Sequence, residues 1–219
     1  HLMFFKKKIF GKLINSFTFP FLFVITIIFC FVFCENFNID NSTFGIYPRD
    51  RKSLFGIFTM VFVHSSVKHL FNNIVPLFIL GSLLFYFYNE VAMKVWIYSI
   101  LYGGILLWLG GRASYHIGAS GLVYALSSFI FLSGILRKNN KLKAISLCII
   151  FLYGGLIWGI FPTYNNISWE GHLFGFINGI FWSLYFKNIG PKKDMYSWDK
   201  EEEVLKELDG IDIKYEIIE

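Results

Sequence analysis

The sequence predicts an all-α, polytopic membrane protein folded as a six-transmembrane-helix bundle. Of the 219 residues, 55% are hydrophobic and only 16% are charged. The chain has 27 phenylalanines and 12 tyrosines, and its apolar residues gather in six long runs separated by polar or basic segments. A water-soluble domain of this length could not bury so many aromatic side chains. The apolar runs are therefore expected to be membrane-spanning helices.

The expected spans are residues 17–34, 69–88, 91–109, 120–136, 142–161 and 171–186. Most of them approach the length of about 20 residues that a helix needs to cross a bilayer. The first span follows a cluster of lysines. We expect it to be an anchor rather than a signal peptide, because five further spans follow it and no cleavage site of small residues does.

One long loop and two terminal segments complete the predicted organisation. The chain divides into a terminal segment at 1–16, a membrane domain at 17–187 and a tail at 188–219. The loop 35–55 mixes polar and apolar residues, which is typical of a functional structure at the membrane interface. In the tail, Ser197 as a cap and Gly210 as a stop predict a helix over 197–208, and a strand-like alternation follows it.

The basic residues predict the orientation of the spans, because lysine and arginine accumulate on the cytoplasmic side of a membrane. Six spans leave both termini on one side. That side has Lys6, Lys7, Lys8, Lys12, Lys94, Arg137, Lys138, Lys141, Lys143, Lys187, Lys192 and Lys193. The opposite side has only Arg49, Arg51, Lys52, Lys68 and Arg112. We therefore expect a multi-pass protein of a cell membrane, the bacterial cytoplasmic membrane, with both termini in the cytoplasm.

Several chemistries are disfavoured by residues that the sequence lacks. None of the expected spans has an aspartate or glutamate in its interior, which argues against aspartyl-protease chemistry and carboxylate proton relays. The chain has no HExxH motif, and Cys30, Cys34 and Cys148 form neither a CxxC pair nor a disulfide framework. No metal or cofactor is expected. The net charge of +5 comes from clusters between apolar runs, so no nucleic-acid binding is expected either.

Polar residues recur in the first turns of the second, fourth and sixth spans, all of which begin at the outer face. These residues are His69 and Asn73, then Ser120, then His172. Polar groups in a membrane usually face the bundle interior or a water-filled cavity. The fourth and sixth spans have roughly 16 residues each, fewer than a crossing needs, so the loop 110–119 is expected to dip inward. Ser120 would then face water below the surface, although by itself it also fits a simple helix cap.

This set of side chains is suited to nucleophilic catalysis. A serine becomes a nucleophile when a base removes its proton, and His172 is the natural base for Ser120. His69 and Asn73 lie four residues apart on one helix face. With the backbone N–H of Ser120 they could donate hydrogen bonds to an oxyanion. Tyr124, one turn after Ser120, is expected to pack against an imidazole from another helix.

Small residues on two spans would let these helices approach closely. Gly121 and Ala125 form one small-xxx-small pair, and Gly175 and Gly179 form another. Such pairs pack helices whatever the function, and here the packing would also bring His172 towards Ser120. No third member of a triad is evident. We expect Glu170 to be an interfacial residue.

These motifs resemble those of the rhomboid intramembrane serine proteases. The matching residues are the HxxxN at 69–73, the GxSG that contains Gly118, Ser120 and Gly121, and the HxxGxxxG at 172–179. Their order and span positions also match, and the resemblance covers residues 17–186. It implies that Ser120 is the nucleophile and His172 the base, that His69 and Asn73 bind the oxyanion, that Tyr124 stacks on the histidine and that His64 is structural.

The resemblance also implies the reaction. The expected enzyme is a serine endopeptidase that cleaves membrane-protein substrates in or near a transmembrane segment, at its outer end. It would prefer a small residue before the cut and a substrate helix that unwinds easily. Phe55 and Gly56 stand where the family often has a Trp-Arg pair, and Gly171 stands where it often has alanine. Neither change removes a group that the chemistry needs.

Two other functions fit parts of the pattern. The same fold without catalysis could bind or chaperone transmembrane segments of client proteins. A small channel or transporter could be lined by His69, Asn73 and Ser120, but the absence of buried charge and of paired discontinuous helices weakens that hypothesis. The sequence specifies no oligomeric state.

Overall fold

The structure is a computed structural model that describes residues 2–162 and 167–191. Its α-helices are α1 (Leu2–Asn36), α2 (Gly56–Thr59), α3 (Val67–Phe87), α4 (Asn89–Gly110), α5 (Ser120–Leu136), α6 (Asn140–Tyr153) and α7 (Trp169–Tyr185). Its 3₁₀ helices are η1 (Asn41–Phe44), η2 (Arg51–Ser53), η3 (Met60–Phe62) and η4 (Gly154–Ile160). The prediction of an all-α fold is confirmed. The helix predicted at 197–208 and the strand-like segment after it lie outside the described residues.

Three helices are long and apolar enough to cross a membrane. They comprise residues Phe10–Asn36 of α1, with a mean hydropathy of 2.6, then α3 with 1.8 and α4 with 1.5. Helix α5 is apolar but shorter, and it begins and ends at the residues that the sequence predicts. The chain is therefore a helical membrane protein with several candidate spans.

The fifth predicted span, 142–161, is not one regular α-helix. Helix α6 ends at Tyr153, and the chain continues as the 3₁₀ helix η4. Three of the seven residues of η4 are glycines: Gly154, Gly155 and Gly159. Glycine weakens an α-helix because it loses more backbone freedom on folding than other residues do. The change of helix type has a functional consequence, because it determines the position of Gly159.

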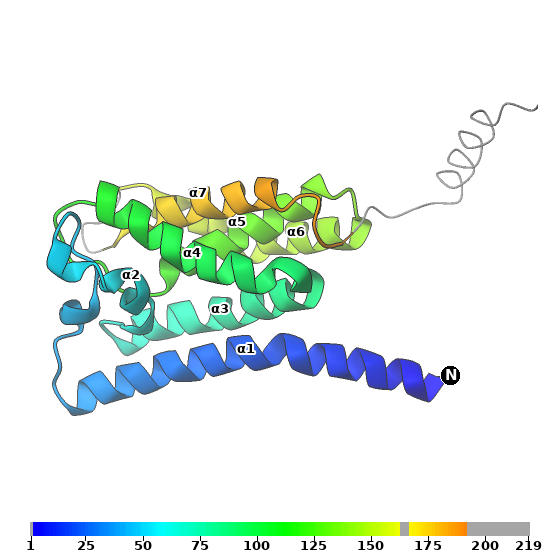
Figure 1. Cartoon of the computed structure of the whole chain (residues 1–219), viewed down its shortest axis with the longest axis horizontal. Helices are drawn as coiled ribbons and strands as arrows, with labels where there is room; N and C mark the ends of the chain where they lie inside the picture. Colours follow the sequence, from blue (N-terminus) through cyan, green and yellow to red (C-terminus); the bar gives the residue numbers. More distant parts are fainter. Residues whose placement is uncertain (1, 163–166, 192–219) are drawn as a thin grey trace, which may run out of the picture.

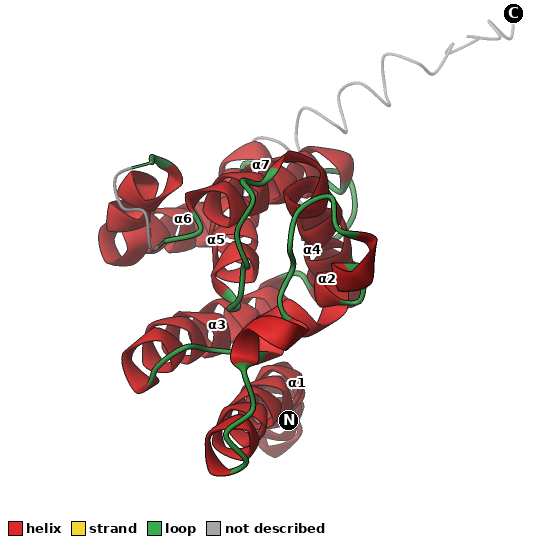
Figure 2. Ribbon diagram, turned by 90° about the vertical axis from the view of Figure 1, so that its left-hand side faces the viewer, coloured by secondary structure: helices red, strands yellow, loops and turns green. Residues whose placement is uncertain are grey.

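Helix α5 is the centre of the bundle. It contacts α7, α6, α3 and α4, and Figure 2 shows these helices around it. Helix α1 lies along the outside and packs mainly on α3 (Figure 1). The largest fully buried side chains include Trp96, Leu80, Leu126 and Phe129. These residues belong to α3, α4 and α5, so much of the buried core lies among these three helices.

The contact between α5 and α7 is closest where the small residues lie. A Cβ atom on Gly175 would overlap the carbonyl oxygen of Gly121, and one on Gly179 would overlap that of Ala125. The hydroxyl of Ser128 also donates a hydrogen bond of 2.9 Å across the contact, to the carbonyl of Phe176. The two backbones are therefore as close as glycine permits.

The loops at one end of the bundle are tied together by backbone hydrogen bonds. Ile46 and His116 exchange two bonds, of 2.9 and 2.8 Å, which pin the loop after α1 to the loop after α4. A Cβ atom on Gly56 would overlap the carbonyl of Gly45, so α2 also begins in close contact with the first loop. Figure 1 places these loops at the end of the bundle opposite the start of α1. The non-helical backbone that leads into Ser120 is thus held by hydrogen bonds to another segment of the protein.

Replacing Gly175 by alanine should destabilise the bundle, because the new methyl group would overlap the carbonyl of Gly121. Overpacking of this kind typically costs about 1–3 kcal/mol. We expect Gly175→Ala to melt at a lower temperature than the unaltered chain in detergent. Gly11→Ala makes the same change in α1, where nothing lies within 4 Å of the new atom, and should melt like the unaltered chain. Equal melting temperatures for the two variants would contradict the packing described above.

Candidate active site

Ser120 is the first residue of α5, but it does not cap this helix. The cap position is Ala119, and no side chain accepts a hydrogen bond there. A true serine cap exists at α3, where the side chain of Ser66 accepts from the backbone N–H of His69. The hydroxyl of Ser120 instead lies 2.8 Å from Nε2 of His172. The interpretation of Ser120 as a helix cap is therefore wrong.

The hydrogen-bond partners of His172 determine which of its ring nitrogens holds the proton. Nδ1 lies 2.9 Å from the carbonyl oxygen of Gly159 in η4. A carbonyl can only accept a hydrogen bond, so Nδ1 must be the donor. In a neutral imidazole the other nitrogen, Nε2, is then an acceptor. The hydroxyl of Ser120 donates to it, which is the arrangement that a general base requires.

Tyr124 fixes the orientation of the imidazole from one side. Its ring is stacked on that of His172, with 4.3 Å between the ring centroids and 9° between the planes. A side chain at position 159 would overlap the Tyr124 hydroxyl and lie 3.1 Å from Nδ1 of His172. Gly159 therefore supplies its carbonyl at a position where no larger residue fits.

His69 faces the loop that leads into Ser120. A Cβ atom built on Gly118 would lie 2.6 Å from Nε2 of His69. Nδ1 of His69 lies 3.5 Å from the backbone nitrogen of Ser65, whose N–H can only donate. This leaves the proton on Nε2, the nitrogen that points towards Gly118. The arrangement directs a donor into the region just before the serine.

Asn73 is buried one turn further along α3, with 3% of its surface exposed. Its side-chain nitrogen donates a bond of 2.8 Å to the carbonyl of His69, in its own helix. None of the contacts that the structure describes joins Asn73 to Ser120. The structure therefore brings Ser120, His172 and Tyr124 together and places His69 beside the loop, whereas the Asn73 amide is engaged within α3.

The backbone before Ser120 is held in a conformation that favours glycine. Gly118 has φ = 106°, and its N–H donates to the carbonyl of Met60 at 2.8 Å. The N–H of Ala119 points to Nε2 of His64 at 3.4 Å. Burial, and to a lesser degree the nearby His69, lower the pKa of His64 to about 3, so its ring stays neutral and can accept this bond. His64 therefore helps to hold the loop in place through this hydrogen bond.

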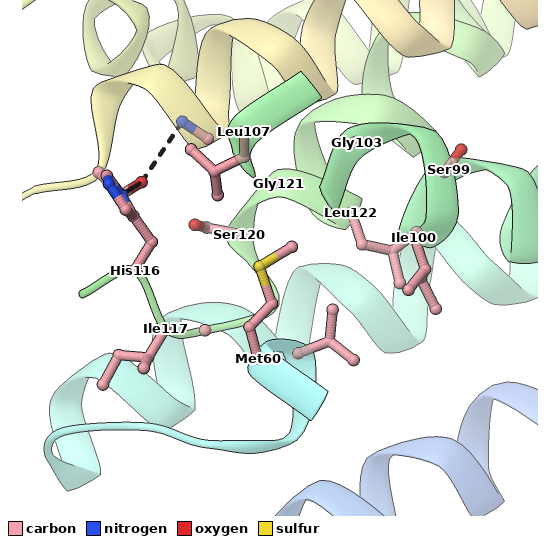
Figure 3. A pocket seen from close by; sticks show the side chains of 14 residues that line it. Met60, Ser99, Ile100, Gly103, Leu107, His116, Ile117, Ser120, Gly121 and Leu122 are labelled. Atoms are coloured by element: carbon pink, nitrogen blue, oxygen red, sulfur yellow. Dashed lines mark hydrogen bonds between the residues drawn. The ribbon is translucent and has the colours of Figure 1, made fainter. Parts of the chain in front are cut away.

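A small cavity of about 20 Å³ opens beside Ser120 (Figure 3). Met60, Gly103, Leu107 and Gly121 are among the residues that line it. Figure 3 shows the Ser120 side chain pointing into the space between these groups and His116. The space suits a water molecule or a methyl group.

A second, apolar cavity of about 190 Å³ lies between α5, α6, η4 and α7, and Tyr124 is part of its wall.

The sequence alone assigned no role to four residues near the site, namely Arg112, His116, Gly159 and Ser168. Glu170, for which we expect a position at the membrane interface, has 3% of its surface exposed and pairs with Arg112 at 3.3 Å. His116 bonds to Ser168 at 2.6 Å. The carbonyl of Gly159 could not have been found, because a backbone group has no signature in the sequence.

In the part of the chain that the structure describes, no three His, Cys, Asp or Glu side chains are grouped so as to hold a metal ion.

Comparison with known proteins identifies related sequences. A model of the Rhomboid domain matches residues 51–189, which contain every candidate site residue. Uncharacterized proteins of Mycobacterium bovis and Mycobacterium tuberculosis are 31% identical over 147 residues, which cover 62% of this chain and 60% of each relative. One of Mycobacterium leprae is 29% identical over 154 residues, covering 65% and 59%. The chain thus spans about 60% of the length of these curated relatives.

The substitution Gly159→Ala should disturb the imidazole of His172, because the methyl group would overlap Tyr124 and crowd Nδ1. In the unaltered chain we expect the ¹⁵N chemical shifts of His172 to report a proton on Nδ1. In Gly159→Ala they should report a mixture of tautomers. Gly155→Ala changes the same 3₁₀ helix at a position with nothing within 4 Å, and should leave the shifts unaltered. A proton on Nε2 in the unaltered chain would contradict the assignment.

Proposed function

The chain belongs to the rhomboid family, and we propose that it is an intramembrane serine endopeptidase that hydrolyses peptide bonds in or near transmembrane segments of membrane proteins. One observation carries this proposal: the 2.8 Å contact between the Ser120 hydroxyl and Nε2 of His172, in the tautomer that accepts a proton. Ser120 and His172 are the proposed catalytic dyad.

The proposed reaction follows from this geometry. Nε2 of His172 takes the Ser120 proton while Oγ attacks the scissile carbonyl carbon, whose oxygen becomes an oxyanion. The protonated imidazole then gives its proton to the leaving amine as the peptide C–N bond breaks. The carbonyl of Gly159 accepts from Nδ1–H throughout. The same imidazole then removes a proton from a water molecule, whose oxygen attacks the acyl carbon of the acyl-enzyme. The imidazolium gives this proton to Oγ of Ser120 as the ester C–O bond breaks, which releases the acid product.

Donors for the oxyanion are available at the start of α5. The first N–H groups of a helix have no partner within the helix, and that of Ser120 is one of them. His69, with its proton on Nε2, adds a side-chain donor beside Gly118. The amide of Asn73 keeps a second N–H beyond the one bonded to His69, and we propose that this group joins the oxyanion site when substrate is bound.

The cavities support a substrate class. The cavity of about 20 Å³ beside Ser120 has room for a small side chain before the cut. The apolar cavity of about 190 Å³ reaches Tyr124 and could hold part of an unwinding transmembrane segment. The proposed partners are therefore transmembrane protein substrates and the lipid bilayer, with no cofactor.

The proposed topology has six crossings, both termini in the cytoplasm and a site that opens to the outer face. Three arguments support it. Helices α5, α6 with η4, and α7 coincide with predicted spans. The site loops gather at the end of the bundle opposite the start of α1 (Figure 1). Two lysine-rich segments that the structure describes, the start of α1 and the connection between α5 and α6, lie towards the other end (Figure 1), as expected for the cytoplasmic face of a bacterial membrane. The division into 1–16, 17–187 and 188–219 is part of this proposal.

Ser120→Ala should abolish cleavage of a model transmembrane substrate by the purified protein in detergent, because it removes the nucleophile. A serine-directed fluorophosphonate should label the unaltered chain at Ser120, and His172→Ala should prevent labelling because the base is gone. Both variants should melt like the unaltered chain. Cleavage that persists in Ser120→Ala would rule out this nucleophile. A folded chain that neither cleaves nor reacts would favour the alternative, a non-catalytic binder of transmembrane segments.

Asn73→Ala tests the oxyanion proposal separately. Removal of one oxyanion donor typically lowers kcat by about 100-fold to 1,000-fold. We expect a loss in this range with little change in KM, in a protein that melts like the unaltered chain. Full turnover in Asn73→Ala would show that this amide serves only α3.

A further inference from the structure

Two polar links outside the dyad join the loop after α4 to the start of α7. In the first, Nη1 of Arg112 lies 3.3 Å from Oε2 of Glu170, and the backbone N–H of Arg112 donates to Oε1 at 3.3 Å. Arg112 also donates through Nη2 to the carbonyl of Ile167 at 2.8 Å. In the second link, Nδ1 of His116 lies 2.6 Å from the hydroxyl of Ser168.

The second link has a definite direction. Nε2 of His116 lies 3.2 Å from the carbonyl of Arg112, so this nitrogen donates. Burial lowers the pKa of His116 and keeps the ring neutral, so Nδ1 accepts from the Ser168 hydroxyl. The same hydroxyl accepts from the N–H of Gly171 at 3.3 Å as the cap of α7. A chain of directed bonds therefore runs from the loop into the first turn of α7.

These links connect the same two segments that contain the dyad. Ser120 follows His116 by four residues, and His172 follows Ser168 by four residues. The His116–Ser168 and Ser120–His172 contacts both join residues 52 positions apart. Parallel connections between two segments prevent one from sliding along the other. The loop is therefore fixed at one position along α7. At this position the Ser120 hydroxyl forms its hydrogen bond with Nε2 of His172.

Burial of the Glu170 carboxylate in the first link favours this one position of the loop along α7 over others. The Glu170 side chain is only 4% exposed, whereas that of Arg112 is 35% exposed. A buried carboxylate without its partner is costly, so any displacement of α7 that separates the pair is opposed. A buried ion pair contributes little net stability, so the role that we assign to this one is to specify a single arrangement of α7 against the loop.

We infer that Arg112, His116, Ser168 and Glu170 form a clamp that positions the Ser120 hydroxyl against His172. The four are positioning residues, because none of the hydrogen bonds that the structure describes joins their side chains to the Ser120 hydroxyl or to the His172 ring. Ser168 meets His172 through the backbone, where the N–H of His172 donates to the Ser168 carbonyl at 3.2 Å. This inference depends on the proposed function only where it predicts an effect on turnover. The hydrogen bond that it sets is a structural quantity, and it can be measured whether or not the protein cleaves peptides.

The test compares Arg112→Gln, Glu170→Gln and the double variant. Each single change should lower kcat for a transmembrane substrate by about 10-fold to 100-fold with KM nearly unchanged, because small misplacements of catalytic groups cost this much. The double variant leaves no unpaired charge and should lose less than the product of the two single losses. Arg51→Gln, an exposed charge in η2, is the matched control and should retain full turnover.

A second readout does not depend on activity. In the folded variants the ¹⁵N shift of His172 Nε2 should move towards that of an acceptor without a partner, as it should in Ser120→Ala. His116→Phe keeps a ring of similar size without nitrogens, and it should produce the same shift if the charge variants fail to fold. Unchanged kcat and an unchanged Nε2 shift in folded Arg112→Gln, Glu170→Gln and His116→Phe would overturn the clamp. Absence of cleavage by the unaltered chain would instead count against the proposed function, and the shift would still decide the clamp.

Discussion

The close approach of α5 and α7 is the constraint on which the rest of the structure depends. Gly175 meets the carbonyl of Gly121 without room for a methyl group. Ser120 precedes Gly121 by one residue and His172 precedes Gly175 by three, so the contact that packs the helices also sets the distance between serine and imidazole. The 2.8 Å separation is a product of backbone packing, and the clamp at the start of α7 removes the remaining freedom to slide.

The His172 imidazole is oriented by neutral groups and not by a carboxylate. The partner of His172 Nδ1 is the neutral carbonyl of Gly159, at 2.9 Å, where a soluble serine protease has an aspartate. A carbonyl directs the tautomer without the desolvation cost of a buried carboxylate. Glu170, the one acidic residue nearby in sequence, is placed against Arg112 instead. Orientation is thus supplied by backbone and by the stacked ring of Tyr124.

Hydrogen bonding of its N–H groups explains why a non-helical loop can lie inside a membrane protein. Between α4 and α5, the N–H groups of His116, Gly118 and Ala119 have partners in Ile46, Met60 and His64. Each partner comes from the segment between α1 and α3. The segment between α1 and α3 therefore holds the loop that leads into Ser120.

The sequence by itself determined the all-α membrane class, most helix boundaries and the candidate residues, because apolar run length and the depth of polar residues are local properties. It also identified the small residues of α5 and α7. Tertiary structure alone decided the break into η4, the tautomer of His172 through Gly159, the pairing of Glu170 with Arg112 and the engagement of Asn73 with His69. These features depend on backbone groups and on residues brought together from distant segments, and neither leaves a periodic trace in the chain.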